Sequence, residues 1–93
     1  MKKINFGSII RDHRIKKGWT QAELARELGY DSPQFISLLE RDQSKAPLYV
    51  LGQLIVLLGI PEGEIIESLV SHYQEDLRNQ INKGKKIANG RGT

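Results

Sequence analysis

The segment over residues 20–41, TQAELARELGYDSPQFISLLER, constrains the fold of this chain more than any other feature. Thr20 and Glu23 have the spacing of a capping box, in which the threonine hydroxyl caps the amide three residues on and the glutamate reaches back. An apolar stripe at helical spacing follows the box, formed by Leu24, Ala25 and Leu28. These residues predict a short amphipathic helix over residues 21–28.

The second half of the segment predicts another helix after a tight turn. Gly29 stands where a chain leaves a helix in a left-handed conformation, which a Cβ atom would penalise. Ser32 and Pro33 are residue types that suit an N-cap and a first helical turn, and Ile36 and Leu39 supply the inward face of a helix over residues 33–41. A small alanine in the first helix lets the two backbones approach, so residues 20–41 predict a helix-turn-helix.

Apolar periodicity and stop signals predict three further helices. One covers residues 5–17 and ends at Gly18, and another opens at Pro47 and ends at Gly59. The last, over residues 62–82, begins with acids that complement the positive end of the helix dipole. No segment shows convincing strand-like alternation, so we expect an all-α chain.

Size, cysteine content and hydropathy narrow the class of protein. The 93 residues make one small domain, and the absence of cysteine excludes disulfides and a thiolate zinc site and suits a reducing cytosol. No apolar run approaches the ~20 residues that span a bilayer. Polar residues follow Met1-Lys2-Lys3 too soon for a secretory signal. We therefore expect a cytoplasmic protein.

The chain resembles the lambda-repressor/Cro-like (XRE-like) helix-turn-helix family over about residues 6–60. The matching positions are Arg14, Gly18, Thr20, Gln21, Leu24, Ala25, Gly29, Ile36, Ser37 and Glu40. The resemblance implies a five-helix, lambda-repressor-like domain that binds double-stranded DNA, in a bacterial or phage-encoded protein. One departure from the family pattern is Tyr30-Asp31-Ser32, which makes the turn one residue longer than the commonest version.

The charge distribution agrees with this resemblance. Residues 1–58 carry nine Lys/Arg and six Asp/Glu, whereas residues 59–82 carry one arginine and five acids. Residues 83–93 carry four Lys/Arg and no acid. We therefore expect DNA to meet the basic first part of the chain and not the fifth helix.

The outward side of the helix over residues 33–41 supplies the candidates for base contacts, because the N-terminal part of a recognition helix lies nearest the bases. Gln34 is the best candidate, since its amide can donate to and accept from adenine at once. Ser37 can bond to several bases, Leu38 can contact a thymine methyl group, and Pro33 offers only shape. The alternative for Gln34 is an ordinary solvated glutamine.

Four residues are candidates for phosphate contacts. Gln21 lies in the first turn of a helix, where free amides attract anions, and the family resemblance implies the same contact. Arg41, Ser44 and Lys45 come at and after the end of the recognition helix, where they can straddle a phosphate backbone. The alternative for Gln21 and Lys45 is a solvated surface side chain.

A structural role is implied for Arg14 and Glu40. In proteins that resemble this one, the arginine of the first helix pairs with the glutamate near the end of the recognition helix, partly buried. The resemblance therefore implies an ion pair that fixes the orientation of the recognition helix. Removing one partner of such a pair would strand a buried charge.

No residue pattern points to catalysis, a metal or a cofactor. His13 and His72 are far apart in the sequence, and neither has a second histidine at ligand spacing. No serine or aspartate has a paired histidine or an oxyanion-type glycine loop. We therefore expect a protein that is not an enzyme and that uses no metal or cofactor.

The fifth helix is expected to have two roles. The apolar residues of its first half close the core, whereas Tyr73, Leu77 and Ile81 extend a short heptad-like seam that suits a dimer contact. We expect a DNA-binding domain over residues 1–82, with its dimerisation helix over residues 62–82. The glycine-rich, basic residues 83–93 are expected to form a disordered tail.

Two functions fit these residues. The first is a sequence-specific transcriptional regulator, a repressor that binds a palindromic operator as a homodimer. The second is a protein-interaction module, an antitoxin or an adaptor, that uses the same fold with little or no DNA binding. The recognition helix separates the two, because Gln34, Ser37 and Arg41 would be dispensable in a protein-interaction module, whereas Tyr73 and Leu77 would not.

Overall fold

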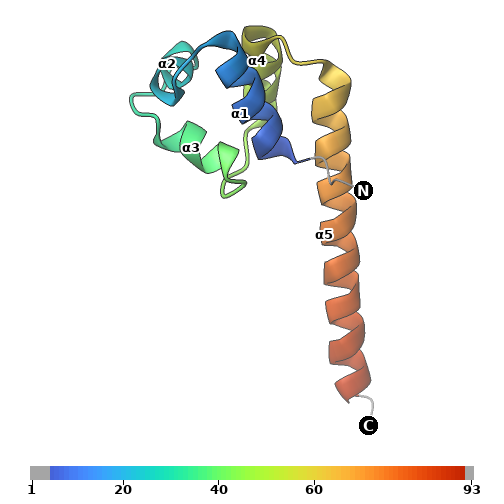
Figure 1. Cartoon of the computed structure of the whole chain (residues 1–93). Coiled ribbons are helices and arrows are strands. Elements are labelled where there is room, and N and C mark those ends of the chain that lie inside the picture. The colour runs from blue at the N-terminus through green and yellow to red at the C-terminus, as the bar shows by residue number, and fades with distance from the viewer. Residues whose placement is uncertain (1–4, 92–93) are drawn as a thin grey trace.

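A computed structural model describes residues 5–91, and over that range every regular element is a helix (Figure 1). The helices are α1 (Phe6–Lys17), α2 (Gln21–Glu27), α3 (Gln34–Glu40), α4 (Leu48–Leu58) and α5 (Glu62–Arg91). The first four gather into a head, and α5 packs on α1 and α4 before it projects away from them (Figure 1). The expected all-α, five-helix fold is confirmed.

Local capping signals set most of the helix ends. Both halves of the Thr20–Glu23 capping box are formed, at 3.0 Å each. Hydrogen bonding to Thr20 also lowers the pKa of the Glu23 carboxyl. The Thr20 backbone amide has the larger effect and the Thr20 hydroxyl the smaller one. Gly18 and Gly59 end α1 and α4 in the left-handed conformation, with φ of 82° and 66°.

The head encloses one apolar core. Side chains from α1, α2, α3 and α4 meet at its centre, and the first turns of α5 cover one side. The side chains with no exposed surface are Ile10, Leu24, Ile36, Leu39 and Leu54. Burial of side chains of this size supplies ~1.5–3 kcal/mol each, so this core holds α3 firmly against α1 and α2.

One detail of the head differs from the sequence-based predictions. Pro33, not Ser32, is the N-cap of α3, and no side chain caps that end of the helix. Instead the Tyr30 and Phe35 rings pack together with their centroids 4.6 Å apart, so an aromatic contact anchors the longer turn. Ile15 is 53% exposed, because the buried side of α1 is formed by Ile10 and Arg14, which lie one turn apart.

The expectation of a disordered tail from residue 83 is wrong for the described part of that segment. α5 continues without a break to Arg91, and residues 92–93 lie outside the described residues. Gly84 and Gly90 weaken a helix by ~1 kcal/mol each, but no proline interrupts it. Among the described residues, no helix is long and apolar enough to cross a membrane.

Candidate nucleic-acid interface

α3 presents an exposed polar face because its other side is anchored in the core. Ile36 and Leu39 have no exposed surface, and they fix the rotation of this seven-residue helix about its axis. Pro33, Gln34 and Arg41 are exposed as a result. The other two candidates for base contacts, Ser37 and Leu38, are partly buried at the edge of the same face.

A buried cluster of charged and polar groups lies behind this face. Arg14 Nε donates to Glu40 Oε2 at 2.6 Å, and Arg14 Nη2 donates to Glu40 Oε1 at 3.1 Å, so the guanidinium binds the carboxylate through two parallel hydrogen bonds. The two side chains are only 11% and 4% exposed. The pairing implied by the family resemblance is therefore the one that the structure contains.

Two further contacts join the cluster to α2. Gln21 Nε2 donates to Glu40 Oε1 at 3.0 Å, and Arg14 Nη1 donates to the Trp19 carbonyl at 2.8 Å. Within the described residues, every buried side-chain nitrogen and oxygen has a hydrogen-bond partner. The cluster thus ties α1, α2 and α3 together, and Gln21 has a structural role that the sequence did not suggest.

α1 also approaches the C-terminal end of α3 closely, and this contact helps to hold the exposed face of α3 in place. The Gly7 amide donates to Asp42 Oδ1 at 3.0 Å. A Cβ atom added to Gly7 would lie 2.4 Å from the Glu40 carbonyl oxygen, so only glycine fits there without movement. Asp42 itself has a positive φ of 56°. Sequence reasoning missed this contact, because the two residues are 35 positions apart.

The candidate phosphate ligands lie in three different settings. Arg41 is exposed at the end of α3, where its Nε donates to the Ser37 carbonyl at 3.3 Å. Ser44 and Lys45 lie in the loop after α3 and line a groove of about 680 Å³ between that loop and α5. Gln21 is half-buried beside Glu40. The four residues therefore do not form a single cluster.

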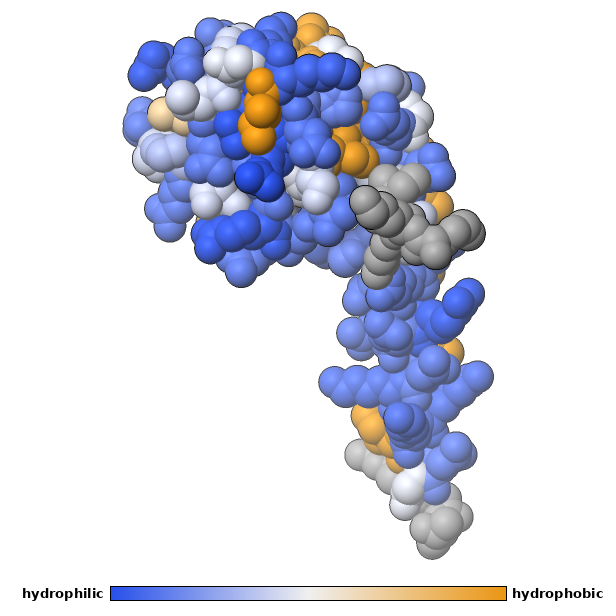
Figure 2. Space-filling model, in the orientation of Figure 1, coloured by the Kyte–Doolittle hydropathy of each residue, from blue (hydrophilic) through white to orange (hydrophobic). Residues whose placement is uncertain are grey.

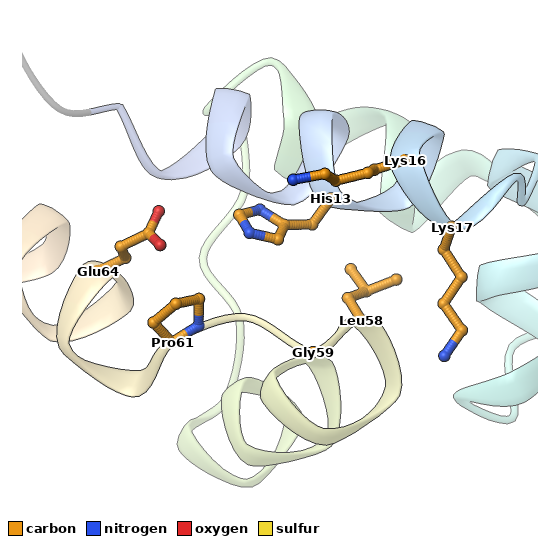
Figure 3. A pocket seen from close by; sticks show the side chains of 7 residues that line it. All are labelled: His13, Lys16, Lys17, Leu58, Gly59, Pro61 and Glu64. Atoms are coloured by element: carbon orange, nitrogen blue, oxygen red, sulfur yellow. The ribbon is translucent and has the colours of Figure 1, made fainter.

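A second hollow, of about 440 Å³, lies between α1 and the junction of α4 with α5 (Figure 3). Its lining residues are His13, Lys16, Lys17, Leu58, Gly59, Pro61 and Glu64. The His13 ring donates from Nδ1 to the Ile9 carbonyl at 2.9 Å, which fixes its orientation. Among the described residues, no three His, Asp or Glu side chains gather as metal ligands would.

These features define a class of protein. A short exposed helix, joined by a glycine-marked turn to a capped helix and locked from behind by a buried ion pair, is the reading head of a helix-turn-helix DNA-binding domain. The helix-turn-helix family matches this chain over residues 10–65. The chain therefore belongs to the helix-turn-helix family, in its XRE-like branch, whose members bind DNA in transcription regulation.

A solved structure extends the similarity beyond the head. The clp gene regulator ClgR from Corynebacterium glutamicum superposes with a TM-score of 0.60 at 25% sequence identity. The alignment covers 88% of this chain and 92% of that one. No curated protein matches the sequence.

Proposed function

We propose that this protein is a sequence-specific regulator of transcription, a repressor that binds a palindromic operator in double-stranded DNA as a homodimer. The observation that carries the proposal is the exposed face of α3. The acid within that helix, Glu40, turns inward to Arg14, so the outward face offers polar, apolar and basic groups and no carboxylate to repel phosphate. The similarity to a clp gene regulator supports a role in transcription.

Base contacts in this proposal come from the first turns of α3. Gln34 is exposed at the N-terminal end, where a side-chain amide can pair with the N6 and N7 atoms of adenine. Ser37 and Leu38 follow on the same face and contact a second base edge and a thymine methyl group. Pro33 shapes the entry into the groove without donating a backbone hydrogen bond.

Phosphate contacts flank these positions. Arg41 and Lys45 supply charge beyond the C-terminal end of α3, and Ser44 adds a neutral hydrogen bond. Gln21 donates one N–H group to Glu40, which leaves a second N–H group for a phosphate at the start of α2. Such contacts fix the register of the protein on DNA and make its affinity depend on salt.

An alternative function is supported by exposed apolar side chains on α4. Leu48, Tyr49 and Val56 are 84%, 71% and 79% exposed. Exposed apolar side chains in a group mark surfaces that bind other proteins. In this alternative the protein is an antitoxin or an adaptor, and the face of α3 is dispensable.

Fluorescence anisotropy with DNA from upstream of the native gene tests the proposal. Wild-type protein should bind this DNA selectively over random DNA, with an affinity that falls steeply as salt rises. Gln34→Ala should lose selectivity, by roughly 1–3 kcal/mol for each adenine it reads. Gln53→Ala is the matched control, because Gln53 is also exposed but lies on α4.

The two functions predict opposite results in this experiment. A folded wild-type protein that binds random and upstream DNA equally would contradict the regulator. Loss of a protein partner in Val56→Gln, together with normal partner binding in Gln34→Ala, would favour the interaction module.

A further inference from the structure

α5 carries an apolar seam that stays exposed in the single chain. Its members, between 42% and 62% exposed, are Ile66, Val70, Tyr73, Leu77, Ile81 and Ile87. The first four follow the alternating spacing of four and three that a paired helix presents to its partner. Figure 2 shows apolar atoms on the projecting, otherwise hydrophilic part of this helix. α5 therefore has one face suited to a second helix.

The charge of α5 reverses sign at the centre of this seam. From Glu62 to Leu77 the helix has five carboxylates and no lysine or arginine. From residue 78 to Arg91 it has five lysines and arginines and no carboxylate. A parallel copy would place like charges side by side, whereas an antiparallel copy places each acidic half beside a basic half.

We propose that α5 pairs with α5 of a second copy of this chain, antiparallel and centred on Leu77. The proposal rests on the homodimer of the proposed function and specifies its interface. The spacing of the seam residues suits a helix as the partner that covers them. The charge reversal along α5 favours a partner helix whose acidic and basic halves run in the opposite order. A second copy of α5, run backwards, has that order.

The register follows from the position of Leu77. With the two Leu77 side chains on the symmetry axis, Tyr73 lies opposite Ile81 of the second copy, and Val70 lies opposite Gly84. A Cβ atom added to Gly84 would meet nothing within the single chain, so this position leaves room for the larger side chain. At the edge of the seam, Glu67 lies close to Lys85 of the second copy, twice by symmetry.

The same register sets the spacing of the two heads. Ile65, 2% exposed, anchors α5 to the core of its own head. In the antiparallel pair the two Ile65 anchors are 24 helical residues apart along the axis, which is about 36 Å. Half-sites one turn of DNA apart are separated by ~34–36 Å. The pairing therefore separates the two anchors by a distance similar to that between the half-sites of a palindromic operator.

Disulfide trapping tests the orientation directly, since the chain has no cysteine of its own. Tyr73→Cys and Ile81→Cys proteins are oxidised singly and as a mixture. In the antiparallel pair, two cysteines at residue 73 are offset by about 12 Å along the axis, beyond the ~7 Å Cα separation that a disulfide spans. Only the mixture should cross-link.

A matched pair of positions controls for random collision. Glu75→Cys and Asn79→Cys have the same symmetric placement about Leu77 but lie on the opposite side of α5, so their mixture should not cross-link. Cross-linking of Tyr73→Cys with itself would show a parallel pair and overturn the proposal. A wild-type protein that sediments as a monomer up to its solubility limit would also overturn it.

Charge reversal tests the register. Glu67→Lys should raise the dimer dissociation constant by ~10-fold, since two pairs become repulsive, and adding Lys85→Glu should restore it. Val56→Gln on α4 should leave the dimer dissociation constant unchanged. A Val56→Gln protein that no longer forms the dimer would overturn the proposal. Selective DNA binding by a monomer would overturn the homodimer and its α5 pairing but not the DNA-binding function. An antiparallel dimer without selectivity would overturn only the DNA-binding function.

Discussion

At the scale of single residues, the buried carboxylate of Glu40 decides how the reading head is held. It accepts hydrogen bonds from Arg14 on α1 and from Gln21 on α2. A buried ion pair adds little net stability compared with apolar residues of the same shape, but a lone buried charge is costly. The value of this cluster therefore lies in the orientation that it gives α3.

Replacing Glu40 should consequently damage both folding and DNA binding. Glu40→Ala leaves the Arg14 guanidinium buried without its partner, which we expect to lower the free energy of unfolding by ~3–5 kcal/mol. Urea denaturation measures this loss, and Glu27→Ala, at an exposed glutamate of α2, is the control. A Glu40→Ala protein with wild-type stability and wild-type DNA binding would contradict this role.

Gly7 should tolerate no side chain. In Gly7→Ala the new Cβ atom meets backbone at the end of α3, and the displacement should cost ~1–3 kcal/mol of stability. Gly63→Ala is the control, because the space around Gly63 is open and alanine favours a helix. Thermal unfolding of the two variants should therefore shift in opposite directions. Equal melting temperatures would show that the close approach relaxes without cost.

The residues predicted correctly from sequence share one property. The capping box and the left-handed glycines at residues 18, 29 and 59 depend on neighbours within a few positions, so their residue types reveal them. The Gly7–Asp42 contact and the Gln21–Glu40 bond depend on how three helices pack. Nothing in the types of these four residues signals their contacts, and Arg14–Glu40 was accessible only through the family resemblance.

At the scale of elements, α5 is the helix whose extent was least predictable. Its apolar periodicity is clear up to Ile81, but beyond that point lysines, asparagines and glycines dominate. Such a composition is typical of disorder when nothing packs on it, and the described side chains after Ser71 are all exposed. Most helical stability in proteins comes from packing of an amphipathic face, so a packing partner would stabilise the distal half.

The seam therefore controls the helicity of that half. Leu77→Gln keeps a good helix former but removes the apolar contact on the symmetry axis. We expect lower helicity by circular dichroism at 222 nm and faster amide exchange over residues 78–91, with an unchanged head. Asn79→Gln, a neutral change on the polar side, should leave both unchanged. Equal exchange in the two variants would mean that the distal half needs no partner.

At the scale of the whole molecule, the head and the projecting helix have different roles in the proposed recognition of DNA. The head contacts bases, and α5 sets the spacing of two heads. One seven-residue helix contacts too few base pairs to select a site in a genome. Two heads held at a fixed spacing read twice as many base pairs, and they do so only when both half-sites lie on the same face of the duplex. Specificity in this proposal thus depends on α5 as much as on α3.

Changing the spacing of the operator half-sites tests whether α5 sets the spacing of the two heads. Inserting five base pairs between the half-sites rotates one by about half a helical turn of ~10–10.5 bp and moves it away from its head. Wild-type affinity should fall to that for a single half-site, whereas Leu77→Gln, which binds as separate heads, should be nearly insensitive to the insertion. Five base pairs inserted outside the operator are the control. Equal losses for wild type and Leu77→Gln would show that the spacing is not set by α5.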